Sequence, residues 1–131
     1  MRYKFGVPML LLASSVFAQS PADITAQGGK KLSKEEIQAL LVGASVSFLS
    51  PAGGDFTLGY DKNGSISGSI MTKGGAQMLG GTWKVDDSGR YCESVSTPRG
   101  GFNGCYDLYS LGGATLFVSE DGKTYRRRIS R

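Results

Sequence analysis

The first regular pattern of apolar positions is helical and covers residues 32–43. Three apolar side chains recur there at three- and four-residue spacing: Ile37, Leu40 and Leu41. Ser33 followed by Glu36 forms a capping-box motif, and Gly43 stands where a left-handed residue commonly ends a helix. The pattern predicts a helix of two to three turns. A helix this short is unstable alone in water, so it must pack against the rest of the fold.

From residue 44 onward apolar and polar residues alternate in short runs, separated by turns rich in Gly, Asn and Asp. The runs are 44–49, 56–60, 66–70, 82–85, 91–95, 105–109, 115–118 and 123–129. Regular spacing of such runs predicts an antiparallel meander of seven or eight strands. A flat sheet would leave one apolar face uncovered. We therefore predict a mainly β protein, in which a short N-terminal helix precedes an antiparallel meander that closes into a small barrel or a strongly bent sheet.

The N-terminus has a different pattern. Arg2 and Lys4 precede an apolar run over residues 5–12, and small residues follow as far as Ala18. This order predicts a secretory signal peptide over residues 1–18, cleaved after Ala18, whose apolar run is too short to span a bilayer. Residues 19–31 are small and polar and predict a flexible leader. Residues 32–131 then form one domain of a periplasmic or secreted protein, with no transmembrane segment in the mature chain.

Composition narrows the classes of function. The chain has 15 Lys and Arg against 11 Asp and Glu, and the predicted signal peptide holds two of the basic residues, which leaves a mature net charge of +2. This excess is too small for a nucleic-acid-binding face. The chain has no histidine, which removes the commonest general base and transition-metal ligand. We expect a non-catalytic protein with no metal site and no cofactor.

The chain has two cysteines, Cys92 and Cys105, in consecutive predicted strands. An even number of cysteines in an exported protein predicts a disulfide. The redox-active alternative needs a close pair such as C-x-x-C, and the spacing here does not supply one. A cross-strand disulfide would hold the Gly-rich segment between the two strands.

That Gly-rich segment, residues 96–104, is the first candidate binding site. Glycines surround Arg99, Phe102 and Asn103, and the predicted disulfide flanks them. Such a loop could present Arg99 as a charged contact and Phe102 as an apolar anchor. The alternative is a long hairpin tip that binds nothing.

Two further groups of residues have both a structural and a functional interpretation. Trp83, Tyr91 and Tyr106 lie on predicted strands and could form the wall of a pocket, although inward side chains of a small barrel usually just fill it. Arg126, Arg127 and Arg128 could make a weak contact with an anionic envelope surface. The default interpretation of this run is a solvated terminal strand at a sheet edge, with Arg127 facing the opposite way from its two neighbours.

The polar turns favour structural roles. Asn63-Gly64-Ser65 matches a glycosylation pattern but has the composition of a hairpin turn. Asp86 and Asp87 precede Ser88-Gly89, where an aspartate commonly caps its own backbone. Neither turn has the spacing of a calcium loop.

The order of these motifs resembles a broad group of small exported proteobacterial proteins of unknown function. The resemblance rests on the helix motif at 32–40, the turn at 60–64, Gly81-Thr82-Trp83, and the Tyr91-Cys92 and Cys105-Tyr106 pairs. It implies a periplasmic β-domain of lipocalin-like or barrel-like shape and brings no catalytic residue. Periplasmic lysozyme inhibitors are similar in size, but their inhibitory loop motif has no counterpart in this chain.

Two classes of function remain. The first is a non-catalytic periplasmic binding or accessory domain for an unknown small molecule or an exported protein. The second is a protein-binding inhibitor or immunity-type protein that acts on an exported enzyme through the 96–104 segment. A small hydrolase is disfavoured, because the sequence has neither a nucleophile elbow nor a pair of buried carboxylates.

Overall fold

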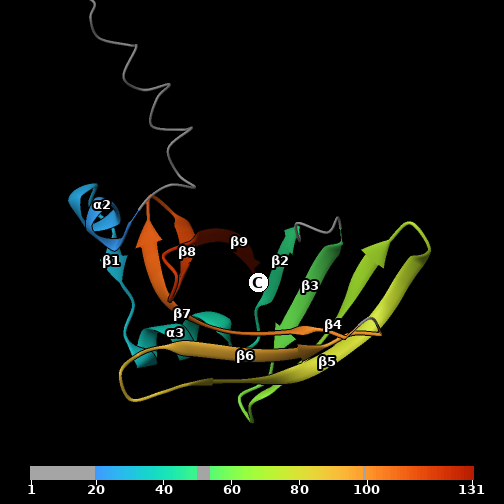
Figure 1. Cartoon of the computed structure of the whole chain (residues 1–131). Helices are drawn as coiled ribbons and strands as arrows, with labels where there is room; N and C mark the ends of the chain where they lie inside the picture. Colours follow the sequence, from blue (N-terminus) through green and yellow to red (C-terminus); the bar gives the residue numbers. More distant parts are fainter. Residues whose placement is uncertain (1–19, 50–53, 99) are drawn as a thin grey trace, which may run out of the picture.

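The structure is a computed structural model that describes residues 20–49, 54–98 and 100–131. These residues form two helices and nine strands around a closed antiparallel barrel (Figure 1). The elements are α2 Pro21–Ala26, β1 Lys30–Lys31, α3 Lys34–Leu41, β2 Ser45–Leu49, β3 Asp55–Tyr60, β4 Ser65–Thr72, β5 Gly75–Val85, β6 Tyr91–Ser96, β7 Phe102–Leu111, β8 Ala114–Ser119 and β9 Thr124–Ser130. The predicted N-terminal signal peptide, residues 1–18, lies outside the described residues.

Eight strands, β2 to β9, form the barrel as a simple meander, each antiparallel to the next. The barrel closes where β9 pairs with β2, from Ser45 opposite Ser130 to Ser47 opposite Arg128. The predicted mainly β fold is confirmed, in its barrel form. One detail is wrong: β9 is not a solvated edge strand, because it pairs with β2 on one side and β8 on the other.

The predicted helix is confirmed as α3, which covers one end of the barrel (Figure 1). The Ser33 hydroxyl accepts from the backbone N–H of Glu36, and the Glu36 carboxylate accepts from the backbone N–H of Ser33. The hydrogen bond from the Ser33 backbone, together with Lys30, holds the pKa of Glu36 below its usual value. Ile37 and Leu41 are completely buried in the barrel core. Burial of this apolar face stabilises a helix that is too short to persist alone.

The prediction of a flexible leader over residues 19–31 is wrong for the described part, residues 20–31. Ser20 and Asp23 form a capping box at the start of α2, and β1 pairs with β7. Ile24 is fully buried against a patch on the outer face of the barrel, formed by Tyr109, Leu116, Val118 and the half-buried Leu111. This patch would otherwise be exposed, so its burial accounts for the ordered segment.

The barrel interior is filled by the alternate residues of each strand. The inward side chains are large and apolar on β3, β5 and β6, for example Leu58, Trp83 and Tyr91. Gly68 and Gly81 interrupt this pattern where neighbouring backbones come very close. A Cβ atom would lie 2.0 Å from the Thr57 carbonyl oxygen at Gly68 and 2.1 Å from the Ser94 carbonyl oxygen at Gly81. Both positions therefore need glycine for β4 and β5 to curve around the core.

The predicted disulfide is confirmed. Cys92 on β6 and Cys105 on β7 are directly opposite each other and bonded, with Cα atoms 4.0 Å apart. Their neighbours in sequence, Tyr91 and Tyr106, contact the core, so the disulfide lies on the outer side of the barrel wall.

Candidate functional site

The predicted recognition loop does not form a single exposed site. Phe102 begins β7 and is half-buried at the end of the barrel away from α3, where its ring meets the edges of Phe48 and Phe56 at centroid distances of 6.5 and 5.6 Å. It is therefore not an exposed anchor, because strand alternation turns it inward with Gly104 and Tyr106. Asn103 faces outward, and Arg99 lies outside the described residues.

The predicted pocket-wall residues Trp83, Tyr91 and Tyr106 all contact the core. Tyr91 is completely buried, and the Trp83 indole N–H donates a hydrogen bond of 2.9 Å to the Asp61 carbonyl oxygen. Their rings form one cluster with Tyr60 and Phe117, at centroid distances of 5.5 to 6.4 Å. Trp83 and Tyr91 thus help to fill the interior, and Trp83 also borders an open pocket of about 490 Å³ on the wall formed by β5, β6 and β7.

A buried ion pair, absent from the sequence-based predictions, crosses the interior. Arg127 of β9 donates two parallel hydrogen bonds of 2.8 Å to the two carboxylate oxygens of Glu93 on β6. The side chains are 5% and 0% exposed respectively, so water stabilises neither charge. Bidentate geometry of this kind is the strongest form of the Arg–carboxylate pair. Burial acts to lower the pKa of the Arg127 guanidinium, but the hydrogen bonds and the negative charge of Glu93 raise this pKa by more, so Arg127 stays charged.

The Arg127 guanidinium is also surrounded by aromatic rings. Its central carbon lies 4.1 Å from the ring centre of Phe48, 4.6 Å from that of Phe117 and 5.4 Å from that of Tyr106. Cation–π contacts of this kind are strong where water is excluded. The three consecutive arginines therefore differ in environment: Arg127 is buried, whereas Arg126 and Arg128 are exposed. Arg127 cannot contact an envelope surface as predicted, because it lies inside the barrel.

Two tyrosine hydroxyls extend the polar network. Tyr91 donates to Glu93 at 2.6 Å, and the hydroxyls of Tyr91 and Tyr60 are 2.9 Å apart. Burial, and then the negative charge of Glu93, raises the pKa of Tyr60 to about 12, with Arg127 acting in the opposite direction. The pKa of Tyr91 is raised well above its usual value by burial and by the neighbouring Tyr60 and Glu93.

These raised pKa values predict alkaline instability. Unfolded Tyr60 loses its proton near pH 10, whereas folded Tyr60 keeps it until about pH 12. Its contribution to stability is therefore complete below pH 10 and is lost as the pH rises towards 12. Between pH 10 and 12 we expect the free energy of unfolding of Tyr60→Phe to fall by about 2 kcal/mol less than that of the wild type. Urea unfolding at a series of pH values measures this difference. Tyr125→Phe, at an exposed ring, serves as the control. Equal pH slopes for the two variants would contradict the prediction.

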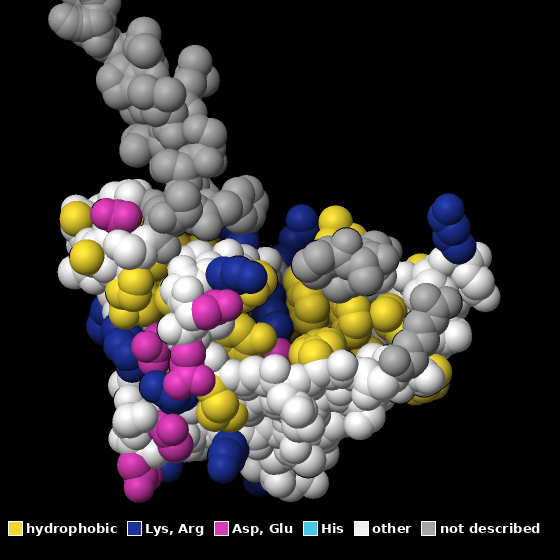
Figure 2. Space-filling view, viewed as in Figure 1, with side chains coloured by type: hydrophobic (Ala, Val, Ile, Leu, Met, Phe, Trp, Pro, Cys, Tyr) yellow, Lys and Arg dark blue, Asp and Glu magenta, His cyan; other side chains and the backbone are white. Residues whose placement is uncertain are grey.

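An open groove of about 820 Å³ begins where β2 and β9 separate. The pairing of these strands ends at Ser47 and Arg128, and beyond it Phe48 and Leu49 line the groove with Arg126 and Arg127. Seen from the side shown in Figure 2, hydrophobic side chains gather in a hollow beside β2 and β3, with basic side chains next to them. Leu49 is 75% exposed and is the most accessible large apolar side chain of this groove.

The outward arginines of the groove differ in their partners. Arg131 donates to the carbonyl oxygens of Ala39 and Leu40 at the end of α3. Arg126 and Arg128 are exposed on the outer face of β9, as strand alternation predicts. Among residues 20–49, 54–98 and 100–131, neither has a carboxylate within ion-pair distance.

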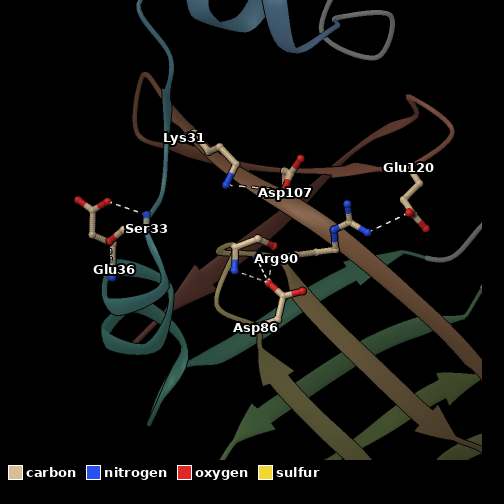
Figure 3. Close-up of polar contacts among 8 residues, drawn as sticks. Lys31, Ser33, Glu36, Asp86, Arg90, Asp107 and Glu120 are labelled. Carbon is tan, nitrogen blue, oxygen red and sulfur yellow. Dashed lines mark hydrogen bonds and ion pairs between the residues drawn. The ribbon is translucent and has the colours of Figure 1, made fainter.

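Several charges elsewhere on the surface are paired with each other. Figure 3 shows Arg90 bonded to Glu120 and Lys31 close to Asp107, with N···O distances of 2.9 and 3.7 Å. The predicted capping turn at Asp86 is confirmed, since its carboxylate accepts from the backbone N–H groups of Ser88 and Arg90. Hydrogen bonds from the Ser88 hydroxyl and the Arg90 backbone lower the pKa of Asp86. Exposed pairs of this kind contribute little to stability, and Arg90, Asp107 and Glu120 border a smaller pocket of about 410 Å³.

The arrangement is suited to binding. The Glu93 carboxylate is engaged by Arg127 and Tyr91. The groove presents Arg126 and Arg128 beside apolar surface, and neither has a carboxylate partner among the described residues. None of the helices in the described parts of the chain has the length and apolarity needed to cross a membrane. No protein-family model, curated protein or solved structure matched this chain.

Proposed function

We propose that the protein is an exported, non-catalytic binding protein that takes a small molecule with an apolar part into the groove between β2 and β9. The observation that carries the proposal is the groove itself, about 820 Å³ in volume, where the exposed Leu49 and the half-buried Phe48 adjoin β9. Ligand sites commonly combine apolar lining with a few polar groups in a volume of this size. Ligand sites also occur at the mouths of β-barrels, and this groove begins where the pairing of β2 with β9 ends.

The non-catalytic part of the proposal is supported by the state of the buried carboxylate. A general base needs a lone pair available to substrate, and the Glu93 oxygens accept hydrogen bonds from Arg127 and Tyr91. The chain has no histidine to take over that role. The groove therefore supplies surface for contact and charge for orientation.

The alternative, an inhibitor that docks through residues 96–104, has less support. It assigned the apolar contact to Phe102, whose ring is packed against Phe48 and Phe56. A protein partner could not bury that ring without opening the end of the barrel.

Export is the second part of the proposal. Residues 1–18 have the pattern of a signal peptide, and a disulfide such as Cys92–Cys105 is typical of proteins in an oxidising compartment. We expect the mature chain recovered from the periplasm to begin at Gln19. Mass spectrometry of the intact protein tests this, and a recovered chain that still begins at Met1 would contradict it.

The binding proposal is tested with a neutral apolar probe, N-phenyl-1-naphthylamine, whose fluorescence rises in apolar surroundings. We expect saturable binding by the wild-type protein, weakened several-fold by Leu49→Ser. Met78→Ser is the matched control, because Met78 is 78% exposed and lies on β5, across the barrel from β9. The proposal fails if the wild-type protein does not bind the probe, or if both variants lower the affinity for the probe equally.

A further inference from the structure

Within the described parts of the chain, no contact of Arg126 or Arg128 explains its charge. Edge strands carry charge to prevent pairing with other chains, but β9 is paired on both sides. Surface arginines also form ion pairs, as Arg90 does with Glu120. Among the residues that the structure describes, Arg126 and Arg128 have no such partner.

The geometry of β9 brings these two charges to one place. Residues two positions apart on a strand point to the same face, roughly 7 Å apart along the strand. Arg126 and Arg128 therefore stand side by side on the wall of the groove. Arg127, between them, faces the interior, and Glu93 neutralises its charge. Asp55 is the one carboxylate among the described residues that line the groove, against four arginines.

Apolar surface adjoins the two charges. Where the pairing of β2 with β9 ends, Leu49 is 75% exposed, and the ring of Phe48 covers the guanidinium of Arg127. A molecule in the groove would meet guanidinium groups on one side and a leucine and a phenylalanine on the other. This combination suits a ligand with one acidic group and one apolar group, because planar guanidinium groups bind acidic oxygens in pairs of hydrogen bonds.

We propose that the groove binds a monomeric amphipathic organic anion, with its acidic group held by Arg126 and Arg128 and its apolar body lying against Leu49 and Phe48. This inference rests on the proposed binding function and adds the chemical class of the ligand. The same chemistry occurs in a free organic acid and in an anionic lipid of a membrane. The open groove is bounded on its two sides by β2 and β9, and we assign it to the free molecule.

Two probes that share one aromatic skeleton separate the contributions. 8-Anilino-1-naphthalenesulfonate carries a sulfonate, whereas N-phenyl-1-naphthylamine is the neutral analogue. We expect the wild-type protein to bind the sulfonate about tenfold more tightly than the neutral probe. The Arg126→Gln/Arg128→Gln variant should lose about tenfold in affinity for the sulfonate and change less than about twofold for the neutral probe.

Lys84→Gln is the matched control for charge. Lys84 is exposed on β5, four strands from β9 around the barrel, so its replacement should leave the binding of both probes unchanged. Because the sulfonate also binds partly unfolded proteins, the thermal unfolding midpoints of all variants must agree with that of the wild type. Raising the salt concentration should weaken the binding of the sulfonate and leave the binding of the neutral probe unchanged.

The outcomes distinguish the two proposals. If neither probe binds, the binding function itself fails. If both bind equally and the arginine variant changes neither, the function stands and the anion inference is overturned. A third arm uses vesicles of phosphatidylglycerol and of phosphatidylcholine. Arginine-dependent binding to phosphatidylglycerol vesicles, without arginine-dependent binding of the free sulfonate, would assign the charges to a membrane surface and overturn the assignment to a free molecule.

Discussion

Replacing Arg127 with methionine is expected to lower the free energy of unfolding by about 3–5 kcal/mol. The variant keeps a side chain of similar length between the rings of Phe48 and Phe117 but removes both hydrogen bonds to Glu93. The Glu93 side chain is 0% exposed, so its carboxylate would be left charged without water or a cation, or would have to take up a proton. Urea unfolding of the wild type and variant measures the loss.

A second variant keeps this prediction testable if Arg127→Met does not fold. Glu93→Leu/Arg127→Met removes both charges together and is expected to lie within about 2 kcal/mol of the wild type, because apolar residues can replace a buried pair at little cost. Arg128→Met, at the exposed neighbouring position, should change stability by less than about 0.5 kcal/mol. A double variant much less stable than the wild type would contradict the explanation by an unpaired charge.

The same pair shows what strand patterns can and cannot predict. Alternation along β9 places Arg127 opposite to Arg126 and Arg128, and alternation along β6 places Glu93 with Tyr91 and Val95 on the inner face. Each strand thus shows one inward charge. Glu93 and Arg127 are 34 residues apart in sequence, and their contact depends on the strand register and closure of the barrel. No local pattern contains that information.

Elements fixed by short-range chemistry were predicted well. The capping box of Ser33 and Glu36, the turn at Asp86 and the Cys92–Cys105 disulfide are all present. Each depends on residues close in sequence or on adjacent strands of a meander. Helix α2 was missed because its one buried residue, Ile24, gives no periodic signal. It is ordered by contact with the outer surface of β7 and β8, which the sequence of the segment does not reveal.

The binding residues predicted from the sequence and the groove proposed above lie in different parts of the barrel for a similar reason. Glycines and a predicted disulfide favour residues 96–104 as a binding loop in the sequence. In the structure β7 already begins at Phe102, and the alternation of side chains along β7 turns Phe102 inward. The groove depends instead on the point where β2 and β9 stop pairing, at Ser47 and Arg128. These strands lie near opposite ends of the barrel sequence. Only the closed fold brings Leu49 beside Arg126.

Removing the Cys92–Cys105 disulfide is expected to lower the free energy of unfolding by about 3 kcal/mol. The bonded residues are separated by 13 positions, and the loss arises mainly because the unfolded chain regains the freedom that the closed loop had removed. A domain of this size has a total stability of about 5–15 kcal/mol, so the loss is a large share of it. Urea unfolding with and without a reductant measures the change.

The location of the disulfide separates its effect on stability from any effect on binding. It joins β6 and β7 on the outer side of the wall and does not line the groove between β2 and β9. We expect Cys92→Ser/Cys105→Ser to be less stable than the oxidised wild type, insensitive to reductant, and unchanged in its affinity for the sulfonate probe while it is folded. A folded variant that lost this affinity would contradict the assignment of the site, because it would show that the groove depends on the opposite part of the barrel wall.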